Sequence, residues 1–177
     1  MNEIAYTIED RDHVQKKETP LTLMMYGDYE CYFCGRAQLV VKTLQEKLGS
    51  DLRFVFRSFP LAQIHARAVH AAYAAEAAAL QGRFWEMHNI LFANQENLGH
   101  EALIGFAKAI GLDIDQFVED MNSERVALRV REDFLSGVRV GVNGTPTFFI
   151  NGRRHDGSYE YDALLSALER QLSHTSR

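Results

Sequence analysis

The stretch at residues 21–34 reads LTLMMYGDYECYFC and joins an apolar run to a pair of cysteines two residues apart. Cys31 and Cys34 are the only cysteines among the 177 residues. The run from Leu21 to Tyr26 predicts a buried strand, the residues after it a turn, and Arg36 to Leu48 a helix. The expected inward positions of that helix are Leu39, Val40, Thr43, Leu44 and Leu48. A cysteine pair between a strand and a helix makes disulfide chemistry the leading hypothesis.

The position of Cys31 at the start of this helix predicts an activated thiol. The first N–H groups of a helix have no partner within it, and the helix dipole is positive there, so both favour the thiolate over the thiol. Because the thiolate is the species that attacks a disulfide, we expect Cys31 to attack. Cys34, one turn further in, is then expected to resolve the mixed disulfide.

Two other interpretations of the pair have weaker support. A structural zinc site needs four ligands, and the sequence holds no other cysteine while its histidines are scattered. An inert pair or a plain stabilising disulfide is disfavoured because a loop this short removes little chain entropy. We expect neither a metal nor an organic cofactor, since thiol–disulfide exchange itself requires none.

Composition and charge narrow the class of protein. A hydrophobic content of 46% allows one well-packed core, with or without a large insertion. The net charge of −5 gives no electrostatic argument for nucleic acid or an anionic membrane. Residues 1–10 lack the pattern of a signal peptide, and no segment has the ~20 apolar residues of a membrane span. We expect a cytoplasmic protein from this sequence as it stands, or a periplasmic or extracytoplasmic one if a leader was removed.

The middle of the chain combines one strand with a long helical block. Residues 51–59 alternate apolar with polar side chains, which predicts a strand buried mostly on one face. The polar residues on its expected solvent face are Arg53, Arg57 and Ser58. From about residue 63 to residue 140 every segment is helical in character, with Asp113 and Ser123 as expected N-caps. The arginines expected to form a solvated face there are Arg125, Arg129 and Arg131.

The last part of the chain predicts a strand, a hairpin and a helix. Residues 145–150 form a buried strand led by a proline, and Asn151-Gly152 is the strongest hairpin signal in the chain. A short return strand follows, and residues 161–172 predict an amphipathic terminal helix. The strand–helix–strand unit implies parallel pairing and the hairpin adds antiparallel strands, so the expected sheet is mixed.

Pro146 marks a second candidate site. Proline cannot donate to a sheet ladder, so it should lie at an edge or facing a site. Only about 5–6% of X–Pro bonds are cis, but the cysteine pair upstream favours cis here. A cis Thr145–Pro146 bond would present the Thr145 backbone beside the cysteines. An extended substrate chain could then pair with that backbone as a strand does.

Two motifs, YGDYECYFCG at 26–35 and GTPTFFING at 144–152, together resemble the DsbA-like branch of the thioredoxin superfamily. The resemblance covers nearly the whole chain, including Asp12-His13-Val14 before the first strand. It implies an α/β thioredoxin fold, with a mixed central sheet and flanking helices. Residues 1–60 and 141–177 would form this fold, and residues 61–140 would form an inserted all-helical domain.

The family resemblance also implies a function. It implies exchange of disulfides with protein or small thiols, assisted by a redox partner. Cys31 would be the nucleophile and Cys34 the resolving thiol, and Thr145-Pro146 would form the cis-proline substrate loop. We expect a monomer, because no heptad pattern marks a dimerisation segment.

This chain departs from the family pattern in two places. Tyr32 and Phe33 fill the dipeptide between the cysteines and supply no histidine charge to lower the Cys31 pKa. We therefore expect a less oxidising couple than DsbA, whose potential is about −120 mV. Similar proteins also tend to carry a buried acid six residues before the first cysteine, where Met25 stands. Glu30 is nearer in sequence, but its turn position predicts that it is exposed.

Aromatic and histidine side chains near the motif have competing interpretations. Tyr32 and Phe33, with Tyr29, could form an apolar surface that binds an unfolded client chain. Alternatively Tyr29 packs inward and only Phe33 is exposed. Trp85 is expected in the core of the helical domain. His65 and His70 are assigned no role.

Three function hypotheses follow. The leading one is a thiol–disulfide oxidoreductase, acting as a reductant in a reducing compartment and as an oxidant or isomerase in an oxidising one. The second is a redox-sensing or peptide-binding module without rapid turnover, which Met25 favours. The third, a glutathione-dependent transferase or isomerase on the same fold, is disfavoured by the intact cysteine pair.

Overall fold

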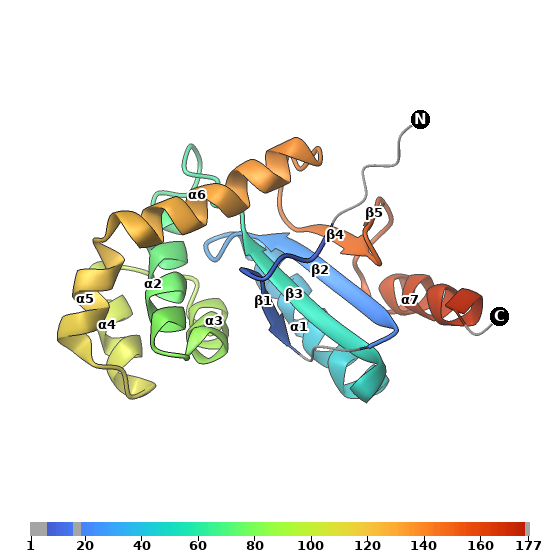
Figure 1. Ribbon diagram of the computed structural model, residues 1–177, viewed down its shortest axis with the longest axis horizontal. Coiled ribbons are helices and arrows are strands. Elements are labelled where there is room, and N and C mark those ends of the chain that lie inside the picture. Colours follow the sequence, from blue (N-terminus) through green and yellow to red (C-terminus); the bar gives the residue numbers. More distant parts are fainter. Residues whose placement is uncertain (1–6, 16–18, 176–177) are drawn as a thin grey trace.

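The computed structural model describes residues 7–15 and 19–175 (Figure 1). Part of the segment in which the sequence lacks a leader pattern, residues 1–10, lies outside the described residues. The outer limits of the predicted thioredoxin-fold segments lie outside them too. Within the described part, no helix is long and apolar enough to cross a membrane.

A five-stranded mixed sheet forms the centre of the molecule, in the order β1-β3-β2-β4-β5. The strands are β1 (His13–Gln15), β2 (Leu21–Gly27), β3 (Leu52–Ser58), β4 (Thr147–Ile150) and β5 (Arg153–His155). β2 and β3 pair in parallel and the other neighbours pair antiparallel. The predicted mixed sheet is therefore confirmed, including the hairpin at Asn151-Gly152. The short edge strand β1 has no clear strand pattern and was not predicted.

Helices cover the sheet and form a separate group beside it (Figure 1). Helix α1 (Tyr32–Leu48), followed by the short η1 (Gly49–Asp51), connects β2 to β3, and α7 (Tyr161–Thr175) packs next to α1. The chain between β3 and β4 forms α2 (Ala68–Leu80), α3 (Phe84–Ala93), α4 (His100–Ala109), α5 (Ile114–Met121) and α6 (Glu124–Arg139). Long α6 leads from that group back toward the sheet. The boundaries of an inserted domain at 61–140 stay a prediction.

Both faces of the sheet are buried, which corrects the expectation for residues 51–59. Side chains on one face, such as Met25 and Phe54, pack into the main core with α1 and α7. Side chains on the other face, such as Met24 and Val55, form a second cluster that Phe134 of α6 helps to cover. Every residue of β3 except Arg53 is consequently buried. The alternation in β3 misled because Arg57, on the same side as Val55, faces this second covered side.

Arg57 is the clearest case of a buried polar side chain, at 2% exposure. Its guanidinium donates to both carboxylate oxygens of Asp12, at 2.6 and 2.9 Å. It also donates to the hydroxyls of Tyr26 and Ser136, at 3.1 and 2.9 Å. These partners satisfy a charge that the sequence pattern had assigned to solvent.

The structure confirms the predicted helix caps but not the predicted buried face of α1. The predicted caps are confirmed, since Asp113 accepts from Gln116 N and Ser123 accepts from Val126 N. Helix α1 begins at Tyr32, four residues earlier than expected. Its buried side is made of Cys34, Ala37, Gln38, Val41 and Leu44. Leu39, expected to be inward, is 66% exposed. The apolar pattern failed here because the buried side of α1 includes a cysteine, an alanine and a glutamine.

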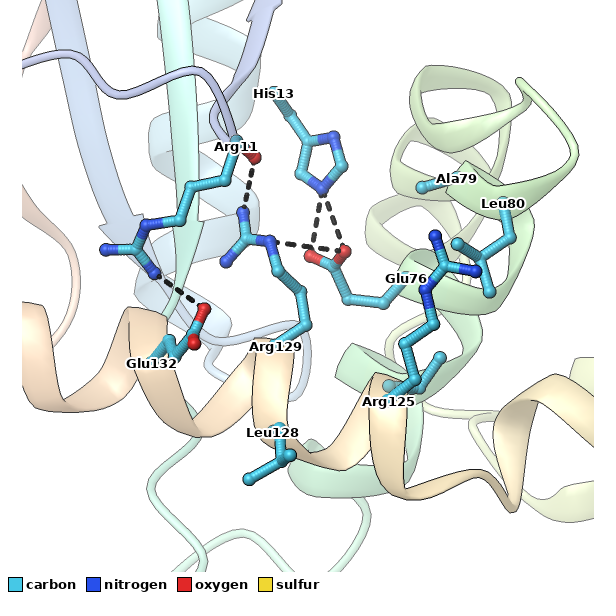
Figure 2. Close-up of a pocket in the computed structure, with 10 residues that line it drawn as sticks. Arg11, His13, Glu76, Ala79, Leu80, Arg125, Leu128, Arg129 and Glu132 are labelled. Carbon is cyan, nitrogen blue, oxygen red and sulfur yellow. Dashed lines mark hydrogen bonds and ion pairs between the residues drawn. The ribbon is translucent and has the colours of Figure 1, made fainter.

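Paired charges join the sheet to the helical group around a cavity of about 490 Å³ (Figure 2). Glu76 of α2 accepts from His13 Nε2 of β1 at 2.9 Å and lies 3.8 Å from Arg129 Nε of α6. Arg129 also donates to the backbone carbonyl of Arg11 at 2.8 Å and pairs with Asp133. Arg129 therefore links the sheet to the helices, and its assignment to a solvated face was wrong.

Candidate active site

The two cysteines lie at the first turn of α1, at the end of β2. Cys31 is the N-cap residue, and its N–H donates to the carbonyl of Asp28 at 3.1 Å. Cys34 is fully buried, whereas Cys31 retains 5% exposure. Both thiols are free. Of the two cysteines, only Cys31 therefore retains any exposed surface.

The proline loop lies directly against Cys31. The Thr145–Pro146 bond is cis, as predicted. The Sγ of Cys31 lies 3.5 Å from the carbonyl oxygen of Thr145. This contact joins residues 114 positions apart, because β4 pairs with β2. The buried hydroxyl of Thr145 has no hydrogen-bond partner among the described residues. The fold thus brings Cys31, Cys34 and the proline loop together.

The two thiols have opposite pKa shifts. A hydrogen bond from the Cys34 thiol, assisted by backbone N–H groups of Cys34 and Phe33, lowers the pKa of Cys31 to about 6, although burial acts in the other direction. Burial raises the pKa of Cys34 well above its ordinary value, and the hydrogen bond to Cys31 adds to this effect. Near neutral pH the pair therefore holds a thiolate at Cys31 and a protonated thiol at Cys34.

Gln95, from the segment after α3, fixes the backbone of the cysteine turn. Its Nε2 donates to the carbonyls of Tyr29 and Cys31, at 2.8 and 2.7 Å. A Cβ at Gly35 would overlap the Gln95 amide, so a larger residue there would push this amide away from the two carbonyls. Sequence reasoning missed Gln95, since a single glutamine between two helices carries no recognisable signal.

Asp28 connects the turn to the loop that follows β3. Its buried carboxylate accepts from Glu30 N at 2.8 Å, from Leu61 N at 2.9 Å and from His65 Nδ1 at 2.7 Å. Its backbone N–H contacts the Sγ of Cys34 at 3.4 Å. Sequence reasoning assigned His65 no role, yet the structure brings it to the cysteine turn through Asp28.

Glu30 also differs from expectation. It is partly buried rather than exposed, and its carboxylate accepts from the N–H of Arg67 at 2.6 Å. The loop after β3 is therefore attached to the cysteine turn at both Asp28 and Glu30.

The aromatic residues around the cysteines divide into two groups. Tyr32 and Phe33 are 67% and 56% exposed and lie edge to face at the rim of the site. Tyr29 is buried, and its hydroxyl contacts His88 Nδ1 at 3.0 Å. Trp85 packs against the core beside His88, as predicted. Both residues between the cysteines are thus available at the surface, whereas the alternative left only Phe33 exposed.

The described part of the chain offers no cluster of metal-binding side chains beside the cysteines. Among residues 7–15 and 19–175, no three His, Cys, Asp or Glu side chains gather in a way that could hold a metal ion. Met25, at the position of the expected acid, is fully buried in β2.

Comparison with known proteins agrees with this geometry. The model of the DSBA-like thioredoxin domain matches residues 22–169. The chain belongs to this family. The DsbA-like assignment made from the two motifs is therefore confirmed, and with it the thioredoxin fold.

Solved structures share the fold of this DsbA-like domain. A thioredoxin-like oxidoreductase from Silicibacter pomeroyi has a TM-score of 0.80 at 25% identity, covering 95% of this chain and 94% of its own. BdbD from Bacillus subtilis has a TM-score of 0.81 at 22% identity, covering 92% of this chain and 94% of its own.

Curated relatives of the DsbA-like domain are longer proteins. A protein named Na(+)/H(+) antiporter NhaA 1, from Salinispora arenicola, is 46% identical over 160 residues, which are 90% of this chain and 24% of that protein. A protein named Na(+)/H(+) antiporter NhaA, from Herminiimonas arsenicoxydans, is 42% identical over 159 residues, 89% of this chain and 25% of its own length. The chain thus spans about a quarter of the length of these relatives.

Proposed function

We propose that this DsbA-like domain is a thiol–disulfide oxidoreductase that works through Cys31 and Cys34. The observation that carries the proposal is a thiol with a pKa of about 6 at Cys31, next to a fully buried protonated thiol at Cys34 and a cis-proline loop. Membership of the DSBA-like family supports this class of activity in general. The exchange partners named below belong to the proposal.

The reaction proceeds in two exchange steps when the dithiol acts as reductant. The Cys31 thiolate attacks one sulfur of a substrate disulfide, forms a mixed disulfide and releases the other sulfur as a thiolate. Cys34 then loses its proton to solvent and attacks the Sγ of Cys31. The Cys31–Cys34 bond forms, the second substrate thiolate leaves, and two electrons have passed to the substrate. In the oxidant direction the same steps run in reverse.

The residues around Cys31 suit an extended polypeptide substrate. The Thr145 backbone beside Cys31 can pair with a substrate strand, and Thr145-Pro146 then orients the scissile disulfide. Tyr32 and Phe33 offer exposed apolar surface next to the reacting sulfur. Leu39 continues this surface along α1. We therefore propose partly unfolded protein thiols or disulfides as substrates, with a separate redox partner that restores the pair.

The Cys31 pKa sets the expected redox potential. At about pH 7 a pKa of about 6 stabilises the reduced form by about 1.4 kcal/mol relative to an ordinary thiol. This raises the redox potential, toward a more oxidising couple, by about 30 mV. In thioredoxin, a thiol pKa of about 7 raises the potential by only about 10 mV, and the measured potential is about −270 mV. The lower pKa of Cys31 adds about 20 mV to that value. We expect a potential of about −250 mV. This is far less oxidising than DsbA, at about −120 mV.

Equilibration with glutathione redox buffers tests the proposal, with Cys31→Ser as the control. Reversible conversion between dithiol and disulfide in the wild type, absent from the control, is the expected result. A potential well above about −200 mV would contradict the argument from the Cys31 pKa. Failure of the wild type to exchange at all would refute the oxidoreductase assignment.

A redox-sensing module is the second candidate. Met25 occupies the position where similar proteins tend to carry a buried acid, and the buried carboxylate of Asp28 is already held by Glu30 N, Leu61 N and His65, which disfavours rapid proton transfer from Cys34. Similar sequences also make up about a quarter of relatives named as antiporters, so a sensing role attached to a larger protein is a natural alternative. Catalysis of insulin reduction separates the two, because a sensor would equilibrate with glutathione but would not accelerate that reaction.

A further inference from the structure

We propose that His65, held by the carboxylate of Asp28, is a positioning residue for the thiols, and that its protonated form stabilises the Cys31 thiolate. This inference rests on the proposed exchange function and adds to it a residue outside the two motifs. His65 follows β3, in the loop that leads to α2. It lies 34 positions from Cys31 in the sequence.

A set of contacts ties His65 to both cysteines. His65 Nδ1 lies 2.7 Å from the Oδ2 of Asp28. The carbonyl of Asp28 accepts from Cys31 N at 3.1 Å, and the N–H of Asp28 contacts Cys34 Sγ at 3.4 Å. Asp28 thus contacts His65 through its side chain and both cysteines through its backbone. Asp28 therefore connects His65 to the cysteine turn.

Negative charge around His65 favours the protonated form of its ring. The acidic groups that face it are Asp28, Glu30 and, once ionised, Cys31. Partial burial lowers the pKa of His65, but the hydrogen bond and charge of Asp28, with the charges of Cys31 and Glu30, offset this and raise it above its ordinary value. The side chain of His65 is 22% exposed, so its ring can exchange protons with water. Arg67 is the nearest cationic residue along the loop.

The dipeptide between the two cysteines supplies no positive charge to the site. Tyr32 and Phe33 bring no cation to the cysteine turn, and Met25 brings no acid. A protonated His65 supplies positive charge from outside the motif while the anion of Cys31 exists. When Cys31 enters a disulfide, that anion disappears and the imidazolium loses one stabilising partner. Because such coupling is reciprocal, oxidation of the pair favours release of the His65 proton to solvent.

The variant His65→Gln tests this role. Glutamine can still donate a hydrogen bond to Asp28, but it carries no titratable charge. The matched control is His70→Gln, since His70 is an exposed histidine of α2 that no hydrogen bond or ion pair in the described structure ties to the cysteine turn. The measurements are the Cys31 pKa, from thiolate absorbance in the reduced protein, and the equilibrium constant with glutathione.

We expect His65→Gln to raise the Cys31 pKa by about half a unit to one unit, as a partly screened charge does. At about pH 7 the equilibrium with glutathione should shift about threefold to sixfold toward the disulfide, or about 12 to 22 mV toward a more reducing potential. His70→Gln should change neither. A second measurement needs no variant: the pKa of His65, followed by NMR in the wild type, should be higher in the dithiol form than in the disulfide form.

Three outcomes would overturn the inference. One is a Cys31 pKa in His65→Gln equal to that in His70→Gln. Another is a loss of folding stability in His65→Gln with no change in the Cys31 pKa, which would give His65 a structural role only. The third is an identical His65 pKa in both redox forms. The thiolate titration does not depend on exchange, so failure of the wild type to equilibrate with glutathione would refute the proposed function and leave this inference standing.

Discussion

Replacing Cys34 with alanine tests why the Cys31 pKa is low. The largest cause is the hydrogen bond from the Cys34 thiol to the Cys31 sulfur. A hydrogen bond to a charged group contributes about 1.5–3 kcal/mol, which corresponds to about 1–2 pKa units. Cys34→Ala should therefore raise the Cys31 pKa from about 6 to about 7–8. Backbone N–H groups at the start of α1 keep it below the ordinary value.

The rate of alkylation by iodoacetamide gives a second signature of the same change. At about pH 6 the thiolate fraction falls from about one half to about 1–10%. A thiolate of higher pKa is a better nucleophile, with a Brønsted coefficient of about 0.4–0.5, so part of this loss is recovered. Cys34→Ala should react about twofold to sixfold more slowly at about pH 6, yet about threefold to eightfold faster at about pH 9. The two rate profiles should therefore cross.

The assay is a pH titration of thiolate absorbance and alkylation rate in the reduced proteins. Cys34→Ser is the matched control, because its hydroxyl retains a hydrogen-bond donor at the same place and should hold the pKa of Cys31 near that of the wild type. Cys31→Ala should abolish the low-pH titration. A Cys31 pKa that stays near 6 in Cys34→Ala would refute the reasoning and assign the shift to the helix N-terminus instead.

Three further predictions concern stability, each measured by urea unfolding. The pKa of Cys31 is lower in the folded reduced protein than in the unfolded chain, so the stability it contributes is complete above about pH 8.5 and is lost as the pH falls through about 6. Relative to Cys31→Ala, the reduced protein should gain about 2.5 kcal/mol between about pH 5 and pH 8, and parallel stability curves for the two proteins would contradict this. Gln95→Ala removes the donor to two carbonyls of the cysteine turn and should cost about 1–3 kcal/mol, whereas an unchanged stability would mean that water replaces the amide. Arg57→Met leaves the buried carboxylate of Asp12 without its main partner and should cost about 3–5 kcal/mol, part of which Asp12→Asn should restore in the double variant; simple additivity would show that the pair is not coupled.

Local pattern was a good guide wherever neighbouring residues decide the structure. The Asn151-Gly152 turn and the caps at Asp113 and Ser123 depend on residues within a few positions, and all three are present. The pattern failed where burial depends on distant elements. Arg57 and Leu39 were assigned to the wrong environments because α6 covers the second face of the sheet and one side of α1 stays open.

The residues of the candidate site also fall into those that a local motif identified and those that only the structure revealed. The sequence identified Cys31, Cys34 and the Thr145-Pro146 loop, since each belongs to a short motif with its own chemical reason. It did not find Gln95 or His65, because neither has a recognisable local signal. Both reach the cysteine turn only through the way the long helical segment and the loop after β3 fold back onto α1.

The sequence by itself determined the strand–turn–helix around the cysteines, the mixed sheet and the family, because backbone propensity, helix capping and motif spacing act over short distances. Only the tertiary structure decided the raised pKa of Cys34, the hydrogen bond from Gln95 to the cysteine turn and the link from His65 through Asp28. Each of these depends on burial or on an atom brought from a distant part of the chain. Electrostatic and hydrogen-bond energies are set by such distances in space and not by separation in sequence.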